Sequence, residues 1–330
     1  MIKKISINNT NNKAFLLLAI LILFNKPVKC QPAQKEGFAP FANIGVFGMS
    51  VNWEYIAQNY EYDCPSNIVL RQFPLILVPV PFFNGGCKYS ASKGIFSFKN
   101  TADASLSLAG IGTSFTSSVS ITPLFSLFAR AHVETAWNYG SAYTLIGLYN
   151  PEEATYESVT PFAEFSYGMA FGANVLVPIT KTNIIKLSYC TDYIAFSAAE
   201  DGEPWLCGTE GNCVNGWRYD ASALYAHTFE GPKLKMVGIS ASLCGIYDED
   251  DFAEIYKPYN PGFKTYSVSA VSQFSIIEKQ SLVVILKASR NRKFEKDIDE
   301  YKPEETLVQK YERAQWCFEG VSLIWTVNLL

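Results

Sequence analysis

Two long alternating segments joined by a short turn lie between residues 160 and 198. The first places larger apolar side chains on one face and small or polar ones on the other; the apolar set is Ala163, Phe165, Tyr167, Met169 and Phe171. This period of two predicts a strand, because successive side chains of a strand point to opposite faces. A soluble strand is about 5 to 6 residues long, whereas a tilted strand needs about 9 to 11 to cross a bilayer. The segment therefore indicates a transmembrane β-barrel.

The same alternation continues through the rest of the chain. Eight such segments are legible from Leu124 to the end, and two or four more are expected before it. From Tyr139 onward the connections between them are alternately long and short. Outer-membrane barrels have an even number of antiparallel strands, short periplasmic turns and long extracellular loops. The sequence therefore predicts an all-β, antiparallel transmembrane β-barrel of about 12 strands, with ten as the alternative.

The whole chain divides into two parts. Residues 1–30 read as a cleavable signal peptide, with a basic leader before the apolar stretch 14–24, which is too short to span a bilayer. Residues 31–330 are expected to form a single outer-membrane barrel domain. Within it, residues 52–100 are the least regular. Pro74, Pro79 and Pro81 argue against a central strand there and favour a loop or an inserted segment.

The polar faces of the predicted strands differ from those of a water-exposed sheet. They carry mostly Ser, Gly, Ala and Asn with scattered charges, while the Lys- and Glu-rich stretches are concentrated in the long connections. Small inward side chains suit a barrel interior. The scattered charged residues are the candidates for lining the lumen: Arg130, His132, Glu134, Glu164, Lys186, Asp192, Arg218 and Asp220.

Aromatic residues gather where the predicted strands meet the long connections. Tryptophan and tyrosine are enriched at membrane–water interfaces, where they form girdles around a barrel. The candidates for such a girdle are Trp137, Trp217, Tyr219, Tyr247, Tyr266 and Trp316.

Few residues offer catalytic or metal-binding chemistry. His132 and His227 are the only histidines, and no nucleophile motif accompanies them, so no enzyme, metal or cofactor is expected. The acidic run 248–251 lacks the spacing of a calcium-binding loop and reads as a solvated surface. Cys207 and Cys213 share a polar, glycine-rich stretch of an exported chain and are the candidates for a loop disulfide.

Several motifs resemble those of a known group of proteins. The stretches 203–205, 215–219 and 236–238, together with the acidic connection after Tyr247 and Ala136-Trp137-Asn138, resemble uncharacterised outer-membrane β-barrel proteins of Treponema-like spirochaetes. The resemblance covers about the C-terminal two-thirds of the chain. It implies an outer-membrane location and brings no established activity or catalytic residue.

Three functional hypotheses follow from this pattern. The first is a porin-like outer-membrane channel for small solutes, and the second is a closed barrel with a structural or adhesive role through its long loops. A secreted soluble β-protein is the third. The expected partners are outer-membrane lipid, the barrel-assembly machinery, and small solutes or an extracellular ligand. The formal net charge of -4 gives no basis for binding nucleic acid.

Overall fold

The computed structural model describes residues 36–51, 69–70, 76–122, 124–139, 144–208, 210–295 and 307–329. All of them belong to one compact unit, Glu36–Leu330. The predicted signal peptide, residues 1–30, lies outside the described residues, as does most of the connection that follows the first strand.

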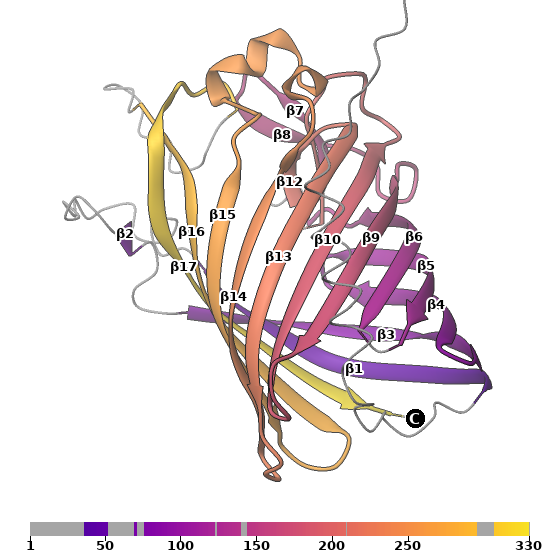
Figure 1. Cartoon of the computed structure of the whole chain (residues 1–330). Helices are drawn as coiled ribbons and strands as arrows, with labels where there is room; N and C mark the ends of the chain where they lie inside the picture. Colours follow the sequence, from indigo (N-terminus) through magenta and orange to yellow (C-terminus); the bar gives the residue numbers. More distant parts are fainter. Residues whose placement is uncertain are drawn as a thin grey trace, which may run out of the picture. The chain divides into compact units, whose positions relative to one another are not determined.

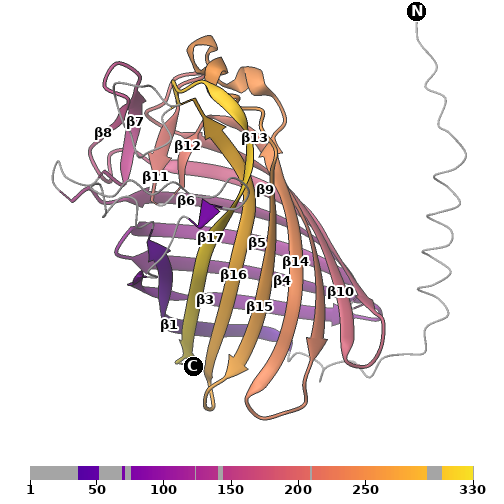
Figure 2. The same cartoon turned by 90° about the vertical axis from the view of Figure 1, so that its left-hand side faces the viewer.

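Twelve strands close into an antiparallel barrel, which confirms the predicted fold class and strand number (Figures 1 and 2). Around the ring each strand pairs with the next, and β1 pairs with β17 to complete the closure. In ring order the strands are β1 (Gly37–Val51), β3 (Ile76–Lys93), β4 (Phe96–Ser107), β5 (Gly110–Ile121), β6 (Phe125–Ala136), β9 (Ser166–Pro178), β10 (Asn183–Phe196), β13 (Gly216–Thr228), β14 (Leu234–Ile246), β15 (Thr265–Ser275), β16 (Gln280–Phe294) and β17 (Tyr311–Asn328). The two-residue β2 (Val69–Leu70) adds a short parallel pairing to β17.

The connections sort by length onto the two ends of the barrel. At the end that holds the C-terminus they are all short, at residues 94–95, 122–124, 179–182, 229–233 and 276–279. At the opposite end they are long from β6 onward, at residues 137–165, 197–215, 247–264 and 295–310. The predicted alternation after Tyr139 is thus confirmed. The β4–β5 connection, Leu108–Ala109, breaks the rule, because it is short and lies at the long-connection end.

Residues 76–100 form barrel wall, so the expectation of a loop or an insertion is wrong for this part. β3 contains both Pro79 and Pro81. They face Gly48 and Val46 of β1, but β4 on the other side ends at Ser107, opposite Phe82. The prolines therefore lie where β3 has one neighbouring strand, and a missing backbone donor can be tolerated there.

Two other strand boundaries differ from the pattern. The Ser/Thr-rich residues 110–121 form one complete strand, β5, because Ile111, Phe115 and Val119 alternate on one face between the hydroxyl side chains. β9 begins at Ser166 rather than at residue 160. The preceding residues form a turn that contains a single bridge between Pro161 and Glu164.

The long connections are folded segments rather than open polar loops. Two of them supply a second sheet, in the order β12-β11-β7-β8, from β7 (Ile146–Asn150), β8 (Thr155–Ser158), β11 (Trp205–Cys207) and β12 (Glu210–Cys213). A third forms the short 3-10 helices η2 (Glu249–Asp251) and η3 (Glu254–Tyr259). Figure 1 shows these elements together at the end of the barrel away from the C-terminus. We call them the cap.

Candidate functional site

The register of the strands separates an outer from an inner face. Large apolar side chains on one face remain exposed along the whole wall, whereas the opposite face holds buried polar residues such as Asp192 and Ser289. The exposed apolar set includes Phe115, Val119, Leu127, Val133, Met169, Phe171, Leu187, Ile239, Val268 and Leu286. Soluble monomers rarely expose so continuous an apolar surface. The face that carries it is the outer one.

The predicted lumen residues on the strands all lie on the inner face. Arg130 of β6, Asp192 of β10 and Arg218 of β13 fall in one row, with Ala170 of β9 between the first two. The neighbouring inward positions hold the remaining strand residues of the set: His132, Glu134, Lys186 and Asp220.

Glu164 does not belong to this row of strand residues. It lies in the turn before β9, where its carboxylate accepts a hydrogen bond from the Ser197 hydroxyl. Its backbone carbonyl accepts another from Thr135 Oγ1 at 2.9 Å. The alternation of residues 160–165 therefore does not correspond to a strand, and Glu164 joins the turn before β9 to the end of β6 and to the residue that follows β10.

The inner face also carries charges outside the predicted set. They are Lys88 on β3, Lys99 and Asp103 on β4, Lys287 on β16 and Glu319 on β17. Lys99 and Asp103 follow the same period of two as Arg130, so their inward position could have been predicted from the sequence. Glu319 was not, because β17 is irregular between Phe318 and Gly320.

Small residues on β9 leave room for large inward side chains on β6. A Cβ atom on Gly168 would meet His132 Cε1 at 2.7 Å, and one on Gly172 would meet the Phe128 ring. Ala170 between them is fully buried. The small residues of β9 therefore allow the side chains of His132 and Phe128 to pack over the inner face of β9.

Two groups of polar contacts stabilise the inner face. Asp192 accepts hydrogen bonds from Arg218 Nη2 at 3.1 Å and Nε at 3.3 Å. Further round the wall, Lys287 lies 2.7 Å from Glu319, which also accepts a hydrogen bond from Asn291. Charged groups in a partly water-excluded interior need such partners. The two signs are thus interspersed around the lumen.

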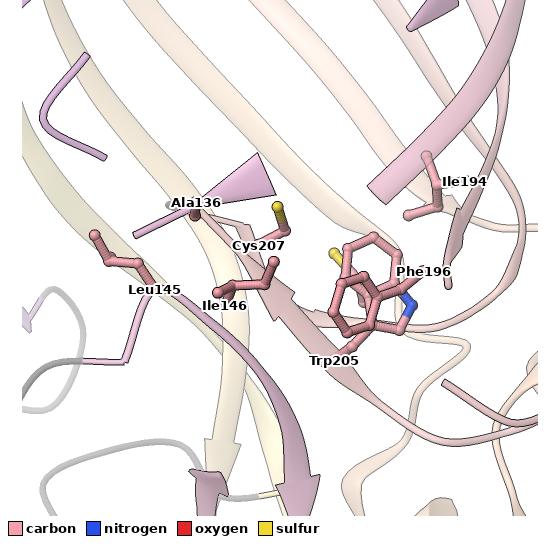
Figure 3. Close-up of a cluster of buried hydrophobic side chains, with 8 residues drawn as sticks. Ala136, Leu145, Ile146, Ile194, Phe196, Trp205 and Cys207 are labelled. Atoms are coloured by element: carbon pink, nitrogen blue, oxygen red, sulfur yellow. The ribbon is translucent and has the colours of Figure 1, made fainter. Parts of the chain in front are cut away.

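The cap has an apolar core of its own, which Figure 3 shows. Trp205 of β11 packs against Phe196 of β10 with ring centroids 5.5 Å apart, and the indole donates a hydrogen bond to Asn215 Oδ1 at 3.0 Å. The same oxygen accepts from the Phe196 backbone N–H at 2.8 Å. The full cluster is Ala136, Leu145, Ile146, Ile194, Phe196, Trp205, Cys207 and Cys213. This cluster packs the cap against β6 and β10 at the long-connection end of the barrel.

Three long connections meet at Asn212 of β12. Its side chain accepts a hydrogen bond from Tyr156 of β8 at 2.5 Å and donates one to Tyr259 of η3 at 3.0 Å, while its backbone N–H donates to the Tyr156 oxygen at 2.6 Å. Burial raises the pKa of Tyr156 far above its usual value, so the phenol remains protonated. We call this trio the latch.

A cavity of about 570 Å³ lies between the cap and the inner face. The barrel contributes Arg130, Asp192, Arg218 and Asp220 to its walls. The cap contributes residues such as Asn212, Asp251 and Tyr259. Burial, reinforced by the neighbouring Asp248 and Asp250, raises the pKa of the Asp251 carboxyl above its ordinary value. Four of the predicted lumen residues, Arg130, Asp192, Arg218 and Asp220, therefore face the cap across a charged cavity.

The predicted girdle and disulfide residues are placed as follows. Trp217, Tyr219, Tyr266 and Trp316 lie on the outer face near the long-connection end, and Tyr247 packs on Tyr219 with centroids 5.0 Å apart. Trp137 follows β6 and donates to the Ser107 carbonyl. Cys207 and Cys213 are both buried in the cap core on neighbouring strands. The girdle role and the disulfide remain predictions.

Within the described ranges, no cluster of three or more His, Cys, Asp or Glu side chains is arranged to hold a metal ion. The acidic run 248–251 instead forms η2, which Asp248 caps by accepting from the Asp250 backbone N–H. None of the helices in the part of the chain that the structure covers is long and apolar enough to cross a membrane.

No family model matches this chain, and no curated protein matches it. Among solved structures, an outer membrane channel from Pseudomonas putida F1 is similar at 8% identity over 92% of this chain and 100% of that chain, with a TM-score of 0.45. The NanC porin gives 6% identity over 88% and 100%, with a TM-score of 0.37. The Pseudomonas putida toluene transporter TodX gives 8% over 90% of each chain, with a TM-score of 0.36. Likenesses this distant carry no argument, and the assignment of a barrel rests on the strand pairing.

Proposed function

We propose that this chain is an integral protein of the bacterial outer membrane and forms a channel for small solutes. The observation that carries the proposal is the contrast between the two faces of one closed wall. Exposed apolar side chains cover the outer face, and the inner face carries charges of both signs. In lipid every backbone polar group must be paired internally, and a closed barrel meets that requirement. A charged interior in turn favours water and polar solutes.

Its partners follow from this location. The outer face would contact outer-membrane lipid, and insertion would depend on the barrel-assembly machinery after export with a cleavable signal peptide. No catalytic residue, metal or cofactor enters the proposal. The likeness to spirochaete barrel proteins agrees with it and adds no activity.

Conductance in planar lipid bilayers tests the channel. The purified, refolded chain should give stepwise currents, and their absence would refute the proposal. Arg130→Glu reverses a charge on the inner face and should shift the ion selectivity toward cations. Lys181→Glu makes the same charge change in the exposed turn 179–182 and serves as the control. Equal shifts in the two variants would show that the current does not pass the inner face.

The second candidate is a closed barrel with a structural or adhesive surface role. The folded cap favours it, because its apolar core and the latch give the long connections a defined surface. Such a protein would show no conductance, yet antibodies raised against residues 247–264 would bind intact cells. Failure of that binding would count against this candidate.

A further inference from the structure

Among the described residues, six charged side chains line the cavity beneath the cap, and their charges cancel. Three are arginines and three are aspartates: Arg130, Arg218, Arg292, Asp192, Asp220 and Asp251. A wall with one sign of charge would select ions of the opposite sign, because a low-dielectric cleft focuses its potential. A balanced wall lacks that preference. It suits an occupant that carries both signs itself.

Four of the six charges already have partners. Arg218 binds Asp192 Oδ2. Arg292 lies 4.1 Å from the Tyr259 ring centroid and donates to the Asn260 carbonyl at 2.9 Å. The Asp251 carboxylate accepts a hydrogen bond from the Trp217 backbone N–H. These groups hold the cavity together and are less available to an incoming molecule.

Two charges and one further oxygen have no such partner. No hydrogen bond or ion pair joins Arg130 or Asp220 to another described residue, and both are exposed to the interior. Asp192 is only 7% exposed, and its Oδ1 has no hydrogen-bond partner among the described residues. A guanidinium can bind a carboxylate through two parallel hydrogen bonds, and carboxylate oxygens accept strong hydrogen bonds from an ammonium group.

We propose that this cavity binds a small zwitterion that carries one ammonium and one carboxylate group, such as an amino acid or a short peptide. Arg130 on β6 binds the carboxylate, and Asp220 with Asp192 on the other side of β9 receives the ammonium. The volume of about 570 Å³ lies within the range of about 300 to 1,000 Å³ that is usual for small-molecule sites. The inference deepens the proposed channel, because it assigns a solute class to the same inner face.

Calorimetric titration of the full chain in detergent micelles tests the assignment. The probes are alanyl-alanine, its N-acetyl derivative, which lacks the ammonium, and its amide, which lacks the carboxylate. We expect the dipeptide to bind and each blocked form to bind at least about tenfold more weakly, because one charged hydrogen-bonding group is lost. Equal binding of all three, or binding of none, would overturn the proposal.

Two variants assign the two ends of the site. Arg130→Gln should remove the preference for the dipeptide over its amide, and Asp220→Asn should remove the preference over the N-acetyl form. Lys99→Gln and Asp103→Asn change the same kinds of charge on β4, outside the cavity lining, and should leave both preferences intact. Equal losses in these controls would mean a general field effect and would overturn the site.

Conductance of the same preparations separates this inference from the channel. Binding with the expected preferences but without current would keep the site and remove the channel. Current without any preference among the three probes would keep the channel and remove the site.

Discussion

The contact between β6 and β9 shows how single residues determine the shape of the inner face. A side chain at position 172 would clash with the Phe128 ring and the Tyr189 carbonyl oxygen. Only glycine at this position leaves enough space for the Phe128 ring. Sequence alternation alone showed that position 172 points inward. It did not show which neighbour fills the space, because that neighbour comes from a strand distant in the chain.

Gly172→Val should therefore destabilise the barrel by about 1 to 3 kcal/mol, the usual cost of overpacking. The measurement is the urea midpoint of unfolding in lipid vesicles, compared with Ala173→Val. Position 173 is the next residue on β9 and faces outward, so the added methyl groups would meet lipid. A midpoint equal to that of the wild type in Gly172→Val would contradict the packing described above.

The ion pair between Asp192 and Arg218 gives a second prediction at this scale. The Asp192 side chain is 10% exposed and that of Arg218 is 34% exposed, so losing Arg218 leaves a poorly hydrated carboxylate and losing Asp192 leaves a partly hydrated guanidinium. Asp192→Asn and Arg218→Gln should each cost about 1 to 3 kcal/mol, and the double variant should cost less than their sum by about 0.5 to 3 kcal/mol.

The exposed pair of Lys310 and Glu295, at 3.0 Å, is the matched control for this double-mutant cycle. Screening by water reduces such surface pairs to between 0 and about 1 kcal/mol. Coupling for Asp192 and Arg218 no larger than that of the control would show that the inner pair is as hydrated as the surface one.

Among the elements, the cap depends on the latch that joins β8, β12 and η3. Tyr156→Phe removes the hydroxyl that bonds the Asn212 side chain and backbone, and leaves those partly buried groups without this partner. A loss of about 1 to 3 kcal/mol in local stability is expected. Hydrogen exchange at β8 and β12 should then accelerate about tenfold or more, while β10 keeps its protection.

Tyr225→Phe is the control for this prediction. Its hydroxyl donates to Asn183 Oδ1 at 3.1 Å, but the residue is exposed and lies on β13, away from the cap. Exchange in the cap should not change in this variant. Equal protection of β12 in Tyr156→Phe and the wild type would show that the latch does not stabilise the cap.

The elements also show what the sequence could predict. Strands such as β9, β10 and β13 were predictable because their apolar residues alternate without interruption. β3 was not, because its prolines are tolerated only where β4 has ended. The cap strands β7, β8, β11 and β12 were missed as well. They are only three to five residues long, and the sheet is completed by β7 pairing with β11, which lies in a different connection far along the chain.

For the molecule as a whole, two thiols on opposite faces of one wall report which face meets lipid. Cys87 of β3 is exposed on the outer face, opposite Ala102 in the middle of β4. Cys244 of β14 is exposed on the inner face, opposite Asp220.

In vesicles, a small charged thiol reagent should modify Cys244 and spare Cys87, because only the inner face is in contact with water. Cys87 should react only after the protein is unfolded in SDS, because a thiol that faces lipid stays protonated and the thiolate is the nucleophile. The variants Cys87→Ala and Cys244→Ala assign each signal. Rapid reaction of Cys87 with the charged reagent would mean that the apolar outer face meets water, and both the membrane location and the channel would then be wrong.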